Sequence, residues 1–358
     1  MKIFTVIGAR PQFIKAAVVS REINKRSGVT EEIIHTGQHY DKNMSDIFFE
    51  EMEIPNPKYN LDVNSMNHGA MTGKMLMQIE EIFMVNRPDI VLVYGDTNST
   101  LAGALAAAKL HIPIAHVEAG LRSFNRRMPE EINRILTDEL SDILFCPTDT
   151  AITNLKREGY ETKGSKVVRC GDVMYDASLY YALKAKLPAG LETKRKKNKF
   201  ALCTIHRPEN TDHYENLEGI FSALIELSKE IDIVLPLHPR TKKKLGNKFN
   251  LNGLIILDPV SYFEIIGLLQ GASYVITDSG GLQKEAYFFK RPCITLRDQT
   301  EWRETLEMGL NRLTGADYDK ILAAYDELKS LPLNFVQSLY GEGNSAKIIV
   351  DVLQSTKL

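Results

Sequence analysis

Short runs of β-branched and other apolar residues recur along the chain, and longer stretches with helical spacing lie between them. The run IVLVY at 90–94 is apolar at every position and does not alternate, which is typical of a strand covered by helices on both faces. Such runs predict two series of strands. The first series is expected at 2–7, 31–36, 89–94, 112–117, 143–146 and 167–169, and the second at 200–205, 232–236, 254–257, 273–277 and 293–296.

The alternation of strands and helices implies right-handed crossovers and therefore parallel sheets. A polar stretch at 183–199 separates the two series, and its basic run favours a solvated connector over an anion-binding patch. We predict an α/β protein of two doubly wound domains facing a cleft, formed by residues 1–170 and 171–343. The helical spacing at 344–354 predicts a last helix, within residues 344–358, that packs back on the first domain.

Composition limits the partners and the compartment. A chain of 358 residues is long enough for two domains, and its net charge of −2 argues against a nucleic-acid-binding surface. The most apolar stretch is broken by Lys109 and His111, so no membrane span is expected, and no signal peptide precedes the first strand. The four cysteines show no metal-ligand spacing. We therefore expect buried thiols, no metal site and a cytoplasmic location.

Ligands of open parallel sheets bind at the carboxyl ends of the strands, so the residues that follow each strand are the first candidates. The first expected strand ends in GARPQ at 8–12, which is neither a dinucleotide fingerprint nor an ATP-binding P-loop. A glycine turn, a helix start and two cations, Arg10 and Lys15, remain. They are suited to a phosphate, although a plain turn with surface cations explains them equally well.

Three acidic positions stand out in the first half. Asp96 follows the strand at 89–94, and its neighbours could cap the next helix without it, so a functional role is favoured. Glu118 ends the strand at 112–117 beside a glycine and has no obvious structural use. Glu130 and Glu131 follow a proline, a pattern typical of a helix N-terminus, and these residues alone do not single out either one.

In the second half, His206 and Arg207 follow the strand at 200–205, and His238 follows the strand at 232–236 in the same way. The sharpest signal is TDSGGLQKE at 277–285, where a buried strand opens onto Ser-Gly-Gly and then a helix. Two glycines expose backbone N–H groups to an anion, and the carboxylate of Glu285, one turn into the helix, could accept two sugar hydroxyls. This pattern favours a nucleotide diphosphate site.

Six motifs coincide in order along the chain: GARPQ (8–12), GDTNST (95–100), HVEAGLRS (116–123), MPEEINR (128–134), HRPEN (206–210) and DSGGLQKEA (278–286). Together they resemble the non-hydrolysing UDP-N-acetylglucosamine 2-epimerases from end to end. The resemblance implies two Rossmann-like domains in the glycosyltransferase-B architecture, no cofactor, a homodimer, and interconversion of UDP-N-acetylglucosamine and UDP-N-acetylmannosamine through a glycal.

The resemblance also implies roles for matched residues. The expected catalytic residues are Asp96, Glu118, Glu130 and His206. The expected contacts with the UDP-sugar come from Arg10, Lys15, Arg122, Arg207, His238, Ser279, Gly280, Gly281 and Glu285.

One stretch departs from the family pattern, because the common T-E-R-P-E reads TEWRE at 300–304. This departure and the adjacent Arg126 and Arg127 resemble a branch that epimerises UDP-2,3-diacetamido-2,3-dideoxy-glucuronate, whose carboxylate an arginine can bind. The alternative, that both arginines face solvent or pair with acids, is slightly favoured. A hydrolysing 2-epimerase, a glycosyltransferase of the same architecture and a nucleotide-sugar sensor stay open as further alternatives.

Overall fold

The computed structural model describes residues 1–38, 52–197, 199–237, 239–245, 249, 251–335 and 339–356, without the side chains of residues 10, 194, 239, 240 and 243. The chain divides into two compact units, Met1–Ala177 with Gln337–Leu358, and Ser178–Val336. No helix among the described residues is long and apolar enough to cross a membrane.

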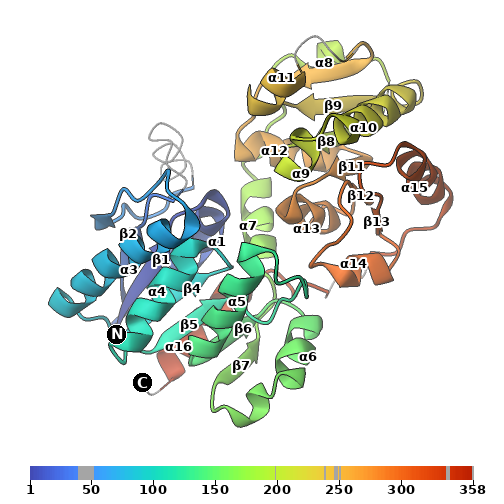
Figure 1. Cartoon of the computed structure of the whole chain (residues 1–358). Helices are drawn as coiled ribbons and strands as arrows, with labels where there is room; N and C mark the ends of the chain where they lie inside the picture. The colour runs from blue at the N-terminus through green and yellow to red at the C-terminus, as the bar shows by residue number, and fades with distance from the viewer. Residues whose placement is uncertain are drawn as a thin grey trace. The chain divides into compact units, whose positions relative to one another are not determined.

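A parallel sheet forms the centre of the first unit (Figure 1). Within the described residues it has seven strands in the order β3-β2-β1-β4-β5-β6-β7. The strands are β1 (Lys2–Ile7), β2 (Thr30–His35), β3 (Tyr59–Asn60), β4 (Ile90–Tyr94), β5 (Ile114–Val117), β6 (Ile143–Cys146) and β7 (Lys166–Arg169). The helical segments are α1 (Arg10–Ile23), α3 (His68–Val85), α4 (Asn98–Lys109), α5 (Pro129–Leu140), α6 (Asp149–Arg157), the 3-10 turn η1 (Tyr160–Thr162), α7 (Val173–Ala182) and α16 (Ser345–Ser355).

The second unit repeats this arrangement. Its described residues form six parallel strands in the order β10-β9-β8-β11-β12-β13. The strands are β8 (Phe200–Thr204), β9 (Asp232–Pro236), β10 (Leu254–Leu257), β11 (Tyr274–Thr277), β12 (Cys293–Thr295) and β13 (Asn311–Leu313). The helices are α8 (Leu191–Lys194), α9 (Pro208–Thr211), α10 (Tyr214–Leu227), α11 (Pro239–Leu245), α12 (Tyr262–Gly271), α13 (Gly280–Phe288), α14 (Arg303–Glu307) and α15 (Tyr318–Ser330). The predicted α/β class with two parallel sheets is confirmed.

Apolar side chains on both faces of each sheet form the cores. In the first unit Phe4 and Val93 pack under α3 and α4 with Phe83. In the second unit Phe221 on α10 belongs to the cluster on one face, and Leu268 on α12 belongs to the cluster on the other. Because both faces are covered, the central strands are apolar at every position.

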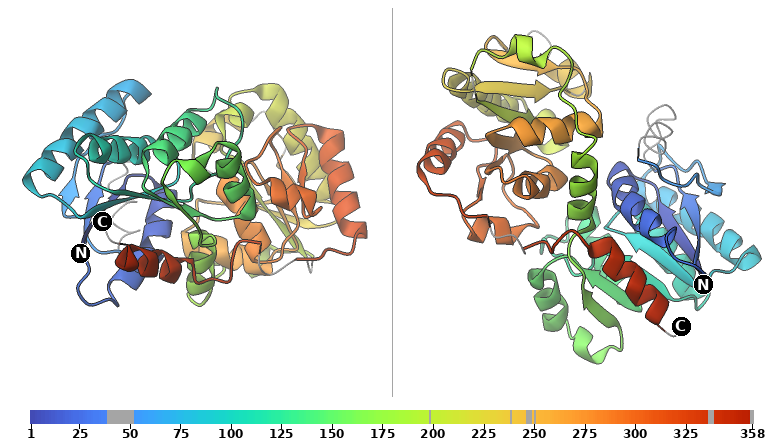
Figure 2. Two further views of the ribbon diagram at one scale, coloured as in Figure 1. Left: turned by 90° about the horizontal axis from the view of Figure 1, so that it is seen from below. Right: turned by 180° about the vertical axis from the view of Figure 1, so that it is seen from behind.

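The last helix, α16, packs beside α1, and Figure 2 shows it running along that helix. Arg26, three residues after the end of α1, forms an ion pair of 2.7 Å with Asp351 on α16. The units divide after Ala177, inside α7, whereas the sequence predicts a division after residue 170. Residues beyond 170 contact the end of the chain in the first unit: the Asp172 N–H donates to the Tyr340 carbonyl at 2.9 Å, and Asp176 accepts from the Ala346 N–H at 2.8 Å.

Strand order places one switch point in each sheet. The chain moves outward from β1 to β3 and then returns to β4, beside β1. In the second sheet it moves outward from β8 to β10 and returns to β11, beside β8. The loops that leave neighbouring strands at such a point diverge, which leaves a crevice at the carboxyl ends where ligands bind. These loops contain Gly8 and Gly95 in the first unit and His206 and Ser279 in the second.

Candidate functional site

Gln12 joins the two loops at the switch point of the first sheet. Its Oε1 accepts from the backbone N–H groups of Gly8 (2.8 Å) and Ala9 (3.0 Å). Its Nε2 donates to the Tyr94 carbonyl and to Thr100 Oγ1, both at 2.9 Å. Gln12 therefore fixes the turn after β1 against the start of the loop after β4. The sequence analysis did not single it out.

Glu118, which follows β5, pairs with Lys15 from α1. Both side chains are nearly buried, at 10% and 9% exposure. Glu118 has φ of +74°, in the left-handed region, a strained conformation that is concentrated at functional sites. A Cβ on Gly95 would lie 3.2 Å from Glu118 Oε2 and 3.3 Å from Lys15 Nζ and would crowd this pair, and the positive φ of Gly95, +63°, also favours glycine there.

Asp96 is held by α5. Its carboxylate pairs with Arg134, and its backbone carbonyl accepts from Asn133 Nδ2 at 2.9 Å. The neighbouring Thr97 caps α4, so Asp96 is not needed for that task. The Asp96 side chain is 31% exposed and Arg134 only 5%, which leaves part of the carboxylate open to solvent. Arg134 lies within the MPEEINR motif, yet the sequence analysis assigned it no role.

The structure separates Glu130 from Glu131. Glu131 is buried and accepts hydrogen bonds from the Ser123 N–H and hydroxyl (both 2.9 Å) and from the Phe124 N–H (2.8 Å). It also pairs with Arg134 at 3.1 Å, so its carboxylate closes the loop that precedes α5. Glu130 is exposed in the first turn of α5.

A buried network lies beneath these loops. Asp138 Oδ1 bonds to His116 Nδ1 at 2.7 Å, and Asp138 Oδ2 accepts from Arg122 at 2.7 Å and from the Gly120 N–H at 3.1 Å. His116 Nε2 lies 2.7 Å from the Gly95 carbonyl, so both ring nitrogens lie within hydrogen-bond distance of an oxygen. Burial raises the pKa of Asp138, but His116 and Arg122 outweigh it and hold the pKa below its ordinary value. The network therefore ties the loops around Gly95 and Gly120 to α5.

Arg122 belongs to this network. It is 2% exposed, and Glu158 accepts from its Nε and from one terminal nitrogen, both at 2.8 Å. Its other terminal nitrogen donates to Asp138. Arg122 therefore pairs with a fully buried carboxylate and with a partly exposed one, which gives it a structural part, and its predicted contact with the UDP-sugar stays a prediction.

Two predicted binding residues fall outside the described side chains. Arg10 begins α1, but its side chain is not described, and His238 lies outside the described residues. Among the residues that are described, no group of three or more His, Cys, Asp or Glu side chains is arranged to hold a metal ion.

Asp278 organises the switch point of the second sheet. Its fully buried carboxylate follows β11 and accepts from the backbone N–H groups of His206 (3.0 and 3.1 Å) and Arg207 (3.0 Å). Asn210 Nδ2 donates to it at 3.2 Å. The His206 ring also lies beside it, with 3.2 Å between Nδ1 and Oδ1, and stays half exposed. Asp278 thus fixes the loop after β8 against the loop after β11.

The predicted diphosphate turn opens α13. The Ser279 Oγ caps the helix by accepting from the Leu282 N–H at 3.4 Å. A Cβ on Gly281 would meet no atom within 4 Å, so this side of the turn is open, whereas a Cβ on Gly280 would lie 2.7 Å from Glu301 Oε1. Glu285 is 6% exposed one turn further on. The Ser279 N–H donates to Thr277 Oγ1 at 2.9 Å, so the N–H groups of Gly280 and Gly281 are the donors at this helix start that suit an anion.

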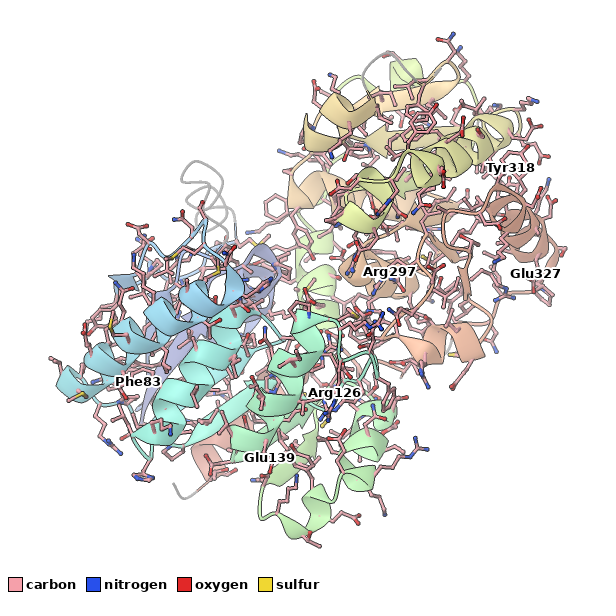
Figure 3. All side chains as sticks on the ribbon, viewed as in Figure 1. Phe83, Arg126, Glu139, Arg297, Tyr318 and Glu327 are labelled. Atoms are coloured by element: carbon pink, nitrogen blue, oxygen red, sulfur yellow. The ribbon has the colours of Figure 1, made fainter. Side chains whose placement is uncertain are left out.

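Arg126 and Arg127 are exposed in the segment that precedes α5, where Figure 3 labels Arg126. Among the described residues neither guanidinium pairs with a carboxylate. Glu131, the acid considered above as a partner for them, is engaged instead by Arg134 and by the Ser123 and Phe124 N–H groups.

The chain is similar to known proteins over its whole length. A family model for UDP-N-acetylglucosamine 2-epimerase matches residues 21–354. A UDP-2,3-diacetamido-2,3-dideoxy-D-glucuronate 2-epimerase of Pseudomonas aeruginosa is 54% identical, and the match covers 99% of each chain.

Two solved structures have the same fold. A UDP-GlcNAc 2-epimerase of Methanocaldococcus jannaschii in complex with UDP-GlcNAc and UDP is 43% identical, with a TM-score of 0.89 over 99% of this chain and 100% of that one. A UDP-GlcNAc 2-epimerase of Neisseria meningitidis bound to UDP-GlcNAc is 31% identical, with a TM-score of 0.90 and the same coverage. The chain therefore belongs to the UDP-N-acetylglucosamine 2-epimerase family of isomerases.

Proposed function

We propose that this protein inverts carbon 2 of a UDP-linked 2-acetamido sugar, interconverting UDP-N-acetylglucosamine and UDP-N-acetylmannosamine by eliminating UDP and adding it back. The observation that carries the proposal is the pair of ion-paired carboxylates, Asp96 and Glu118, at the switch point of the first sheet. Family membership supplies the reaction class, and these loops supply the groups that the reaction needs.

The chemistry explains why carboxylates are needed. The hydrogen on carbon 2 is not next to a carbonyl and is barely acidic. When the bond from carbon 1 to UDP breaks, its electron pair leaves with UDP, and positive charge at carbon 1 acidifies that hydrogen. A base then removes the proton, and the C–H electrons form the double bond of a glycal. Protonation of carbon 2 on the opposite face and re-addition of UDP complete the inversion, so two proton-transfer groups are required.

We assign the proton transfers to Asp96, Glu118 and Glu130. Two of these carboxylates each face a cation, since Lys15 pairs with Glu118 and Arg134 pairs with Asp96. Lys15 is also a cation that a diphosphate can bind, and a phosphate that draws it away leaves the Glu118 carboxylate available for a proton.

We assign the nucleotide mainly to the second unit. The Ser279 hydroxyl and the backbone N–H groups of Gly280 and Gly281 would bind the diphosphate, and Glu285 would accept the ribose hydroxyls. The remaining contacts with the departing diphosphate are assigned to Arg10, Lys15, His206, Arg207 and His238.

The test is turnover of UDP-N-acetylglucosamine in heavy water, with no acceptor present. We expect UDP-N-acetylmannosamine as product, and deuterium at carbon 2 in both product and recovered substrate, because solvent-exchanged groups reprotonate the glycal. Turnover with complete retention of protium would refute the elimination. Free N-acetylmannosamine would instead indicate a hydrolysing enzyme, and a requirement for an acceptor would indicate a glycosyltransferase.

A second substrate is favoured by a separate observation. The relative that is 54% identical is named for UDP-2,3-diacetamido-2,3-dideoxy-D-glucuronate, and this chain presents Arg126 and Arg127 without carboxylate partners among the described residues. An arginine can bind a sugar carboxylate through two parallel hydrogen bonds. The uronate is therefore the second candidate substrate.

The two sugars are distinguished by the ratio of their kcat/KM values in the wild type and in Arg126→Ala and Arg127→Ala. If an arginine binds the carboxylate, its removal should cost about 10- to 100-fold on the uronate alone, the strength of a charged hydrogen bond. Arg157→Ala, an exposed arginine on α6, is the matched control. Equal losses on both sugars would show that the arginines do not select the substrate.

We also propose a homodimer. Large apolar side chains are exposed on two helices of the first unit, Met77 and Met84 on α3 and Ile132 and Leu136 on α5. Apolar side chains that are exposed in the monomer can be covered at an interface between two copies of the chain. Light scattering at micromolar concentration should give twice the chain mass, and a monomer would contradict the assembly.

A cytoplasmic location is part of the proposal. All four cysteines are buried free thiols, a state typical of a reducing compartment. Cell fractionation that recovers the activity outside the cytoplasmic fraction would contradict it.

A further inference from the structure

Trp302 is the chain's single tryptophan, and it lies against the first turn of α13. Its side chain is buried, with 3% of its surface exposed. The indole Nε1–H donates to the Gly280 carbonyl at 3.0 Å. Trp302 thus holds the residue at the centre of the proposed diphosphate turn, at the position where the family pattern has an arginine.

A second contact joins Trp302 to the same helix. The ammonium of Lys284 lies 4.0 Å from the centroid of the indole ring, and Lys284 is 2% exposed. A buried cation over the face of a tryptophan is attracted by the ring's electrons, and this attraction strengthens as water is excluded. The indole therefore contacts α13 at two points one turn apart, the Gly280 carbonyl and the Lys284 side chain.

The residues beside Trp302 join the same turn. Thr300 Oγ1 accepts from the Trp302 N–H at 3.2 Å and donates to Gln283 Oε1 at 2.7 Å. Gln283 Nε2 in turn donates to the Ser279 carbonyl at 3.2 Å. This chain of bonds ties the start of the helix to the segment that contains Trp302.

An ion pair closes the other side of the turn. Arg297, labelled in Figure 3, lies 3.2 Å from Glu301, and both side chains are nearly buried. The Glu301 carboxylate occupies the space that a Cβ on Gly280 would need. The direction of the peptide groups at Gly280 is therefore set by residues 297–302 as well as by the helix.

We propose that Trp302 is a positioning residue for diphosphate binding. By holding the Gly280 carbonyl and the Lys284 ammonium, it fixes the direction in which the N–H groups of Gly280 and Gly281 face the phosphates. The inference rests on the proposed function, because that function places the diphosphate at this turn. It has two consequences: loss of the indole N–H weakens phosphate binding selectively, and phosphate binding changes the emission of Trp302.

The first experiment compares Trp302→Phe with the wild type by calorimetry, using UDP and uridine as ligands. Phenylalanine keeps an aromatic ring beside Lys284 but lacks the N–H donor and is smaller than the indole, so the melting temperature of the variant is measured as well. We expect UDP to bind about 5- to 10-fold more weakly, the cost of one hydrogen bond, and uridine, which has no phosphate, to bind within about 2-fold of the wild type. Tyr325→Phe, a buried ring elsewhere in the second unit, is the matched control and should change neither affinity.

A purely structural role for Trp302 predicts a different result. A general loosening of the second unit would lower its melting temperature and weaken both ligands alike. Equal weakening of UDP and uridine, or no weakening of either, therefore overturns the proposal.

The second experiment uses the emission of Trp302 in the full-length wild-type chain. A UDP titration should change this emission saturably, with the dissociation constant that calorimetry gives. Lys284→Met should shift the emission of the unliganded protein, because the cation no longer lies over the ring. An emission that does not change while calorimetry shows the site filling with UDP overturns the proposal.

These outcomes also separate this inference from the proposed function. A wild-type protein that neither binds UDP nor turns over either nucleotide sugar refutes the function. A wild-type protein that does both, with a Trp302→Phe variant that binds UDP equally well, refutes only the role of Trp302.

Discussion

Replacing Asp138 with asparagine tests the buried network beneath the first site. The Asp138 carboxylate is fully buried and accepts from His116 (2.7 Å), Arg122 (2.7 Å) and the Gly120 N–H (3.1 Å). Asparagine has nearly the same shape, but its amide nitrogen donates and would face a donor, and its side chain carries no charge. The buried positive charge of Arg122 would then lose one of its two negatively charged partners, so we expect the free energy of unfolding to fall by about 3–5 kcal/mol.

The assay is urea-induced unfolding followed by circular dichroism. Glu139→Gln is the matched control, because Glu139 is the next residue on α5, is exposed and pairs with Lys163 at the surface. A surface pair contributes about 0–1 kcal/mol, so this variant should unfold close to the wild type. Trp302 lies in the second unit. The urea midpoint measured by its emission should therefore shift less than the midpoint measured by circular dichroism. A loss below about 1 kcal/mol in Asp138→Asn would show that the network does not depend on this charge.

The same variant predicts a pH dependence. In the folded protein the pKa of Asp138 lies below its ordinary value of 3.8, despite the opposing effect of burial, because His116 and Arg122 favour its charged form. A lowered folded pKa gives stability that is fully present above the unfolded pKa and is lost as the pH falls through the folded pKa. The difference in stability between wild type and Asp138→Asn should therefore be constant from about pH 5 to 7 and shrink below about pH 4.

Three further outcomes follow from the described contacts. Glu130→Gln should lose about 10²-fold or more in turnover with unchanged unfolding. Glu131→Gln should lose about 1–3 kcal/mol of stability, because the buried Glu131 carboxylate accepts four hydrogen bonds, and initial rates and unfolding curves check both variants. Asp96→Asn and Glu118→Gln should each lose about 10²-fold in turnover while calorimetry still detects UDP binding, and wild-type rates would remove them from the mechanism. Burial raises the pKa of Cys293 to about 12 and also raises the pKa of the other three thiols. A thiol reagent should therefore label the protein only after unfolding, and rapid labelling of the native chain would contradict this.

The fold was predictable because its central strands carry a strong signal. Strands covered on both faces must be apolar at every position, and the run that became β4 shows this directly. The strands β3 and β13 were not predicted, since two or three residues such as Tyr59–Asn60 and Asn311–Leu313 have no apolar run. Their pairing depends on the neighbouring strand, which a local pattern does not show.

The candidate site was predictable only in part. The rule that ligands bind at strand ends points to Asp96 and Glu118, but it does not reveal their partners on other elements. Gln12 reaches the Tyr94 carbonyl across 82 positions of sequence, and Arg134 reaches Asp96 across 38. Such contacts arise only when the sheet brings the helices together.

The choice between Glu130 and Glu131 shows the same limit. Both follow a proline at the start of a helix, where acids are favourable whatever they contact. The phase of α5 against the sheet decides that Glu131 points inward, where the N–H groups of Ser123 and Phe124 meet it. Glu130, one position earlier, is turned about 100° around the helix axis and stays exposed.

Charge balance explains how two carboxylates can occupy adjacent loops of one sheet. Asp96 follows β4 and Glu118 follows β5, which are paired neighbours, so two negative charges at these strand ends repel each other. Each one faces a cation from a helix, Arg134 of α5 for Asp96 and Lys15 of α1 for Glu118. The two cations differ in kind: Arg134 is also paired with the buried Glu131 and is fixed, whereas Lys15 is an ammonium on a flexible stem. A substrate diphosphate can therefore draw the cation away from Glu118 more readily than from Asp96, and Glu118 is the carboxylate whose environment substrate binding changes most.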